Sequence, residues 1–597
     1  MNKMKNTIIA ILFLTVTGAV LLWSACKDNS KKPAVLSQNK TAYSTIQLPQ
    51  DALSTCTIPQ DTFNTWFLTG KATENGHVTP ANSITFGHQN NCDFYQWSER
   101  MFLWVTSPNT GEYGSTGRVL ESPVFYTVAP DTSGGMTLIK HLPGTILPVV
   151  PALKKNGPNR LPLFSDRKGH LFEVWFHKAG EKVLVKNSSG KIIELGPVGK
   201  DAKGIILLKD KQGVAIEKPQ FVTKLTNPKN VIHAFATSNG NVFFDMNGNQ
   251  VETELAQATQ DALMAQNGSL VYYITFVNDM YAYFLAAVQA KYMSGYQFPT
   301  TLSGRDSIMA YAKQQGYSLP PDSNALAIEL KTSWIIADSL SDASGFVTID
   351  AIIPTYNTSS PSEWPVTGQQ QVKLALVGMH VVGSVAGHPE MIWATFEHNS
   401  NTPNASYQYI DSNKIVQTVP ADKGNWLFNS NTSLPADSFN NPHMTADSVN
   451  TLFAEAPYTT ISASNTLRLF PFGAAFNLVP NQQDTSASAS NTEVISINNN
   501  IMGMIPGNDI RKNYVFIGAT WTNSGTAPNG NVYSSDPSKG SAIGTSLLAN
   551  STMETYLQGT AFSCFTCHNN NNSLAPGALS HIFDSINPVK NILKKMK

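Results

Sequence analysis

The stretch Gln371-Val372-Lys373-Leu374-Ala375-Leu376 alternates polar and apolar side chains, and residues 327–334 show the same period of two. Successive side chains of a strand point to opposite faces, so this pattern, with polar residues on one face, predicts a half-exposed sheet. Residues 391–398 form a third strand-like run, and we expect it to pair beside the other two. These runs predict a fold that is built around a β-sheet.

A helix is predicted over residues 91–104, where Phe94, Trp97, Met101 and Trp104 follow one another at steps of three, four and three. This spacing places the four side chains on one helix face. An aromatic stripe of this kind is more often core than the wall of a cofactor cavity, so we interpret it as core.

The remaining pattern predicts an α+β fold with β-rich mixed sheets. A hairpin is expected over residues 182–195, because Ser188-Ser189-Gly190 separates two apolar runs. Further strands are expected at residues 171–177, 241–244 and 514–517, and further helices at 252–265, 269–293, 307–315 and 546–558. The helices at 252–265, 269–293 and 307–315 make a central helical segment over about residues 251–318.

Near the C-terminus, Cys564-Phe565-Thr566-Cys567-His568 is a C-x-x-C-H motif, which is typical of c-type haem attachment in an exported protein. Two thiols at this spacing reach both vinyl groups of one porphyrin, and the histidine becomes an axial iron ligand. A zinc knuckle would need a second ligand pair, and the sequence has no second C-x-x-C. A dithiol redox site would not require the histidine. We therefore expect one covalent haem c on Cys564, Cys567 and His568.

The N-terminus predicts export. Lys3 and Lys5 precede an almost wholly apolar run over residues 8–23, which is followed by Ser24-Ala25-Cys26. This order is that of a secretory signal peptide. The segment ending at Cys26 resembles a bacterial lipobox, in which the cysteine becomes a lipid-modified N-terminus; an ordinary signal peptide is the alternative. The address would be the bacterial cell envelope, periplasmic or at the outer membrane or surface.

Cys56 and Cys92 are the cysteines that these two roles leave over. They form a natural pair for a disulfide in an oxidising compartment, although two buried thiols remain an alternative.

The chain of 597 residues divides by composition into five parts. We expect a signal peptide (1–25), a flexible polar tether (26–45), one or more mixed α+β domains (46–480), a loop-rich connection (481–545) and a haem-attachment segment (546–597). The formal net charge of zero gives no electrostatic case for nucleic-acid binding. The most apolar internal run, residues 271–293, is interrupted by Asn278, Asp279 and Lys291, so we expect no membrane-spanning helix after the signal peptide.

Residues 564–583 resemble a c-type cytochrome beyond the motif itself. Such domains often carry a Pro and a Leu after the motif histidine, and the Pro carbonyl accepts the ring N–H; the resemblance implies this role for Pro576 in Ala575-Pro576-Gly577-Ala578-Leu579. Only 29 residues follow His568, so the distal side of the haem must come from upstream chain. Residues 94–104, 329–334, 378–381, 392–398, 514–521 and 553–556 also resemble an uncharacterised family of large bacterial exported haem proteins.

The residue opposite His568 stays open among several candidates. His581 follows in sequence, Met502 and Met504 lie in a Gly/Pro-rich turn, and His380 and His398 flank the predicted strand pair. An open or water-bound iron is a further alternative.

These observations predict a lipid-anchored monohaem c-type cytochrome that transfers electrons to or from an unidentified redox partner protein. A haem enzyme with an open coordination site, acting on peroxide or another small oxidant, and a binding module with an accessory haem are the alternatives. The sequence contains no nucleophile triad, P-loop, dinucleotide fingerprint or H-E-x-x-H motif, so it assigns no catalytic residue.

Overall fold

The computed structural model describes residues 42–586, and part of the sequence interpretation lies outside them. The chain is described except for residues 110, 112, 115–116, 131–135, 143–145, 149–158, 160, 162, 166–170, 178–180, 201–205, 226–227, 238–239, 252–261, 294–296, 320, 436–437, 447–450, 456–457, 473–484, 531–539, 560–562 and 569–572. The signal peptide, Cys26 and most of the tether therefore lie outside the described residues, as do residues 252–261 of a predicted helix.

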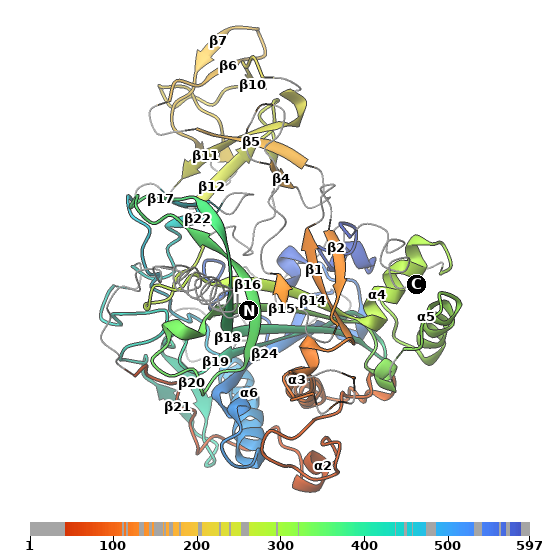
Figure 1. Cartoon of the computed structure of the whole chain (residues 1–597). Helices are drawn as coiled ribbons and strands as arrows, with labels where there is room; N and C mark the ends of the chain where they lie inside the picture. The colour runs from red at the N-terminus through yellow and green to blue at the C-terminus, as the bar shows by residue number, and fades with distance from the viewer. Residues whose placement is uncertain are drawn as a thin grey trace, which may run out of the picture. The chain divides into compact units, whose positions relative to one another are not determined.

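A sheet of ten strands forms the centre of the fold (Figure 1). Its order is β2 (Met136–Lys140), β1 (Phe125–Pro130), β14 (Tyr272–Asn278), β15 (Ile328–Ile336), β18 (Val366–Val385), β19 (His388–His398), β24 (Tyr514–Thr522) and β25 (Ala542–Gly544). β16 (Thr348–Tyr356) pairs with β18, and β3 (Leu147–Pro148) pairs with β16. Strands make up 31% and helices 21%, which confirms the predicted α+β class at this coarse level.

The strands predicted from period two are confirmed. Residues 366–373 of β18 alternate between exposed and half-buried side chains, and from Leu374 onward the strand is buried except at His380. β19 is buried along its whole length and pairs antiparallel with β18, as expected. Complete burial means that both faces of the sheet are covered at β19. The expectation of a half-exposed sheet is therefore wrong for β19 and for β18 from Leu374 onward, except at His380.

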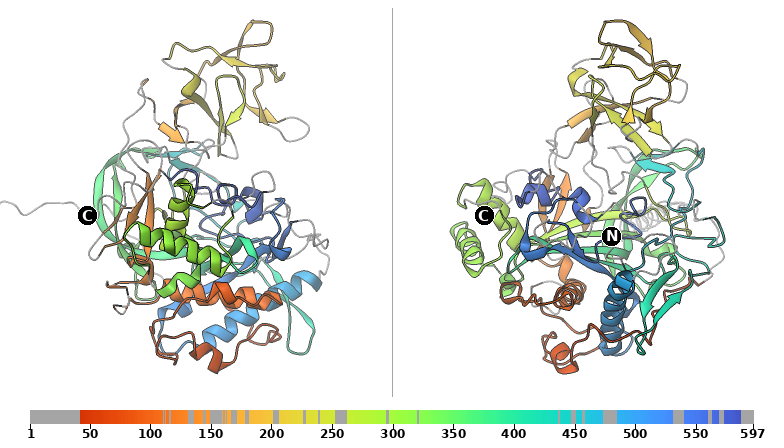
Figure 2. Two further views of the ribbon diagram at one scale, coloured as in Figure 1. Left: turned by 90° about the vertical axis from the view of Figure 1, so that its right-hand side faces the viewer. Right: turned by 180° about the vertical axis from the view of Figure 1, so that it is seen from behind.

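One face of the sheet is covered by α3 (Asn91–Val105) and α6 (Thr485–Met504), which lie side by side in Figure 2. The ring of Phe102 in α3 stacks on Phe396 of β19, with 4.2 Å between ring centroids. In α6, Asn498 donates to the Phe516 carbonyl of β24 and accepts from its N–H. The predicted helix over 91–104 and its interpretation as core are confirmed, because its four-residue stripe is buried.

The expectation of a loop-rich connection over 481–545 is wrong at α6, which was not predicted, whereas the strand predicted at residues 514–517 lies within β24. Asn, Ser and Thr are frequent in α6, and these residues favour turns when helix propensity alone decides. Burial of Val494, Ile497 and Ile501 against the sheet overrides that preference.

The predicted helix over residues 269–293 is also partly wrong. Tyr272–Asn278 is strand β14, and only Asp279–Gln289 is helical, as α4. β-branched residues and an alternating apolar pattern favour β14, which fills the place between β1 and β15 in the sheet. Asn278 ends the strand and caps α4 by accepting from the Tyr281 N–H. α5 (Leu302–Gln314) is close to its predicted range and packs beside α4 (Figure 1).

Residues 163–251 contain the strands of three smaller sheets. The predicted hairpin is confirmed as β6 (Leu184–Lys186) and β7 (Ile192–Glu194). A five-stranded sheet has the order β13 (Gln250–Val251), β12 (Gly240–Phe244), β11 (Val231–Thr237), β5 (Leu171–His177) and β4 (Leu163–Ser165). Among the residues that the structure describes, no helix is long and apolar enough to cross a bilayer.

A disulfide joins Cys56 to Cys92, at a sequence separation of 36. Cys92 lies in the first turn of α3, and the backbone N–H of Cys56 donates to Ser496 of α6. The bond therefore fastens the N-terminal stretch to the two helices that cover the sheet.

Replacing both cysteines, as Cys56→Ser with Cys92→Ser, should lower the apparent free energy of unfolding by about 2–5 kcal/mol, because the unfolded chain regains loop entropy. Urea unfolding with and without a reductant is the measurement. Wild-type protein should lose stability on reduction, whereas the double variant should not respond. Equal responses to the reductant would contradict the assignment.

Candidate functional site

The register of the central strands brings polar residues from distant parts of the sequence to one face, opposite α3 and α6. Directly paired residues of antiparallel strands share a face, and so do residues two apart along a strand. We call this surface the polar face. Its three cross-strand rows are Tyr273–Ser333–Gly378–Glu397, Thr275–Lys331–His380–Thr395 and Val277–Glu329–Val382–Trp393.

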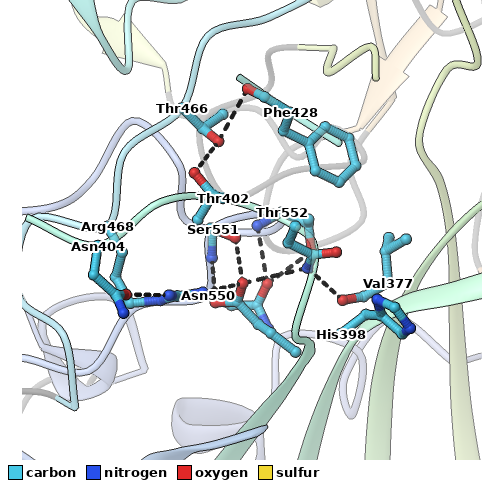
Figure 3. A network of polar contacts seen from close by, with 12 residues as sticks. Val377, His398, Thr402, Asn404, Phe428, Thr466, Arg468, Asn550, Ser551 and Thr552 are labelled. Atoms are coloured by element: carbon cyan, nitrogen blue, oxygen red, sulfur yellow. Dashed lines mark hydrogen bonds and ion pairs between the residues drawn. The ribbon is translucent and has the colours of Figure 1, made fainter. Parts of the chain in front are cut away.

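Residues 550–552 of the C-terminal segment contact the first row. Figure 3 shows Asn550, Ser551 and Thr552 in the surrounding polar network. The side chain of Asn550 donates to Thr395 and to the Phe396 carbonyl, at 2.8 and 3.2 Å. Its oxygen accepts from both the N–H and the hydroxyl of Thr552. Tyr273 adds a hydrogen bond of 2.7 Å to the Thr552 carbonyl.

Gly378 makes this close approach feasible. A Cβ at this position would lie 2.5 Å from the Thr552 hydroxyl oxygen and 2.6 Å from the Ser333 hydroxyl oxygen. Any side chain there would push the 550–552 segment off the sheet. Glycine is therefore required by packing, and not by its backbone conformation.

Glu397 is the fixed charge beneath this segment. Its carboxylate accepts from the Ser551 N–H at 2.8 Å, from the Ser551 hydroxyl, and from Arg468 Nη2 at 2.6 Å. Arg468 also donates to Asn404. The side chains of Glu397 and Arg468 are 0% and 2% exposed, so this ion pair is buried. Paired and hydrogen-bonded burial of this kind is how a protein interior tolerates charge.

The predicted helix over residues 546–558 is wrong, because turns replace it. Asn550, Ser551 and Thr552 use their side chains to bond the sheet and one another. Short polar side chains that bond nearby backbone groups compete with helix formation. Tertiary contacts with Glu397 and Thr395 decide the outcome here.

The second row contains a hydrogen-bonded pair that joins the sheet to the same segment. His380 Nε2 lies 3.0 Å from Glu554 Oε1, and both side chains are largely buried. Glu554 is itself fixed, since its N–H donates to the Asn550 carbonyl and its second oxygen accepts from the Asn550 N–H. Burial alone would raise the pKa of Glu554, but the adjoining His380 and the charge of Lys331 bring it below its ordinary value.

The C-x-x-C-H motif forms one helical turn, α7 (Cys564–Cys567). Ser563 and Thr566 cap it reciprocally, and Thr566 Oγ1 accepts from the Ser563 N–H at 2.9 Å. Residues three apart lie on the same side of a helix, so the two sulfurs face the same way. Both cysteines are thiols and both are partly exposed. This arrangement suits two thioether bonds to one macrocycle.

His568 follows the turn, and one of its two ring nitrogens bonds a backbone carbonyl. Its Nδ1 bonds the carbonyl of Leu579 at 2.8 Å, so Nε2 is the ring nitrogen that would bind a metal. The expected acceptor, Pro576, is wrong: the Pro576 carbonyl accepts the Ser580 N–H, because residues 576–579 form a helical turn, α8 (Pro576–Leu579). The carbonyl of Leu579, at the end of that turn, takes the role.

Neighbouring rings fix the plane of the His568 imidazole. The ring centroid of Trp393, in the third row, lies 4.2 Å from that of His568. The ring of His581 stacks on the His568 ring, with 4.1 Å between centroids and an interplanar angle of 13°. Burial lowers the pKa of His568 well below its ordinary value, and the charge of His581 lowers it further. A neutral imidazole with one nitrogen bonded to a carbonyl is the state that binds a metal, so these residues fit a haem.

The third row holds the end of the described chain. Ser580 donates to Glu329 Oε2 at 2.7 Å and contacts the Tyr281 hydroxyl of α4 at 2.8 Å. An apolar cluster packs around these polar contacts; it includes Val382, Trp393, Phe565, Leu579 and Phe583. Burial raises the pKa of Glu329 to about 7, against the opposing effects of Ser580 and Lys331.

The other proposed iron ligands occupy different places. His398 is buried on the α3 face, stacks on Phe346 at 3.7 Å, and bonds Ser400 and the Gly345 carbonyl. Met502 and Met504 lie at the end of α6, one of the two helices that cover the face opposite the polar face.

Sequence reasoning missed Lys331, Glu329, Glu554 and Trp393 as members of the site. The one available signal was charge within strand-like runs, since Glu329 and Lys331 alternate with buried residues in β15. Within the described ranges, no group of three or more His, Cys, Asp or Glu side chains has the arrangement of a metal-ion site.

Removing one partner of the Glu397–Arg468 pair should be much more damaging than removing both. Arg468→Met leaves a buried carboxylate without its counter-ion and should lower the apparent free energy of unfolding by about 3–5 kcal/mol. The double variant with Glu397→Gln should recover most of that loss, as measured by urea unfolding.

The matched control is Lys373→Met, which breaks an exposed pair with Asp350 and should cost at most about 1 kcal/mol. If Arg468→Met were as mild as this control, the buried pair would not hold the segment.

Glu329 should make stability depend on pH. A carboxyl group with a raised pKa binds more protons when folded, so its contribution falls as pH rises from 4.5 to about 7. Glu329→Gln removes this contribution, so the Tm of the variant relative to wild type should rise between about pH 5 and pH 8. The exposed Glu363→Gln is the control. Parallel Tm curves for wild type and Glu329→Gln would show that the group is not buried.

Neither a family model nor a curated protein nor a solved structure matched this chain. The chemistry assigned to the site is therefore argued from its own residues.

Proposed function

We propose that this protein is an exported monohaem c-type cytochrome that transfers electrons. Cys564 and Cys567 would hold the haem by thioether bonds, and His568 would bind the iron. The haem supplies a one-electron redox centre when bound. Signal-peptide removal at Cys26 would leave a lipid anchor in the bacterial cell envelope, with a polar tether before residue 46.

The single observation that carries this proposal is the His568 Nδ1 contact with the Leu579 carbonyl. A ligating histidine nearly always donates its second ring N–H to an oxygen acceptor, which fixes the tautomer and the ring orientation. The one-turn helix supplies the two thiols directly before it. Covalent attachment keeps the cofactor on the protein outside the cell membrane.

A haem enzyme is the second candidate, and the charges beside His568 favour it. His380, Lys331 and Glu554 interact electrostatically with one another or with the motif. Such groups are able to carry protons to a small oxidant at an open iron site. Carbon monoxide and cyanide would shift the absorption spectrum of an enzyme of this kind and leave a carrier with two strong axial ligands unchanged.

Expression in a bacterium that attaches c-type haem should give a protein that stains for haem after denaturing electrophoresis. Cys564→Ser with Cys567→Ser should abolish the stain, because both thioether bonds are lost. Thr566→Ser is the control: it keeps the capping hydroxyl between the cysteines and should stain like wild type. A stained double cysteine variant, or an unstained wild-type protein, would refute covalent attachment.

A further inference from the structure

We propose that His380 is the second axial ligand of the iron and that Glu554 is the positioning residue for its ring. This inference rests on the proposed haem attachment and names the residue that comes from the upstream chain. It makes the protein a two-imidazole electron carrier whose ligands come from a strand and from the C-terminal motif.

The first argument is the side of the sheet. His380 projects from the polar face, two positions along β18 from Val382, which pairs with Trp393. Trp393 contacts the His568 ring at 4.2 Å. His380 and the motif therefore lie on the same side of the main sheet.

The second argument is that the other candidates lie elsewhere. His398 pairs with Tyr514, whose ring contacts Phe102 of α3. Met502 and Met504 belong to α6, which covers the same face as α3. His581 is on the correct side, but it stacks parallel to His568 at 4.1 Å. The second axial ligand must be separated from His568 by the porphyrin. A ring that stacks directly on His568 would lie on the same side of the porphyrin as His568, so His581 is excluded.

The third argument is orientation. A ligating histidine needs a rigid ring and an acceptor for its other nitrogen, and a carboxylate is a common acceptor. Glu554 supplies this acceptor at 3.0 Å from Nε2, which leaves Nδ1 for a metal. Two backbone contacts with Asn550 fix Glu554, and Asn550 is held on the sheet by Thr395. The His380 ring is thus oriented by Glu554, which Asn550 holds, and Asn550 is bonded in turn to Thr395 on the same face.

The test is the spectrum of the purified holoprotein. Wild type should be low-spin in absorption, with an electron paramagnetic resonance signal of two imidazole ligands. His380→Ala should keep the haem stain, because the cysteines are unchanged, but should become high-spin. Added imidazole should restore the low-spin spectrum of this variant, which a loss of folding would not allow. His88→Ala removes an exposed histidine and should leave the spectrum unchanged.

Glu554→Gln should stay low-spin and shift the reduction potential to more positive values, because the His380 ligand becomes less electron-rich. The exposed Glu363→Gln should not shift it. If His380→Ala does not fold, His380→Met serves instead: it should lose the signal of two imidazoles while the haem stays attached.

A stained His380 variant with a wild-type spectrum would overturn the assignment of His380 and leave the proposed function standing. A high-spin wild-type spectrum would also overturn the assignment of His380, and it would favour the haem enzyme over the electron carrier. Wild-type protein without a haem stain would overturn both.

Discussion

The buried carboxylate of Glu397 is the constraint on which the site depends. It lies on the polar face of the central sheet, paired with Arg468 and bonded to Ser551. A charge in this position is tolerated only with its partners in place. The 550–552 segment is therefore held against the sheet, with Gly378 providing the room for close contact. The other contacts of the C-terminal chain with the polar face come from residues that follow this segment in the sequence.

After this segment the chain contacts the second and third rows of the polar face. Glu554 bonds His380 in the second row. In the third row, His568 contacts Trp393 and Ser580 donates to Glu329. The proposed haem segment is thus built into the sheet of the main body and is not a cytochrome module joined by a linker.

Local periodicity predicted much of the sheet, but it did not predict the site. β15, β18, β19 and helix α3 follow from spacing alone. Strand β14 and helix α6 did not, because burial overrode their local preferences. The contacts of the site join residues far apart in sequence, with separations of 154 for Ser551–Glu397 and 174 for His380–Glu554. Alternation along a strand predicts which residues share a face, but it does not predict which segment of the chain covers that face.

Hydrogen exchange of residues 550–555 tests most directly whether this segment is part of the sheet. The N–H groups of Ser551 and Glu554 are bonded to Glu397 and to Asn550. They should be as protected as the amides of β18 and β19 and exchange only with global unfolding. Exchange at the rate of a surface loop, while the sheet stays protected, would contradict the account.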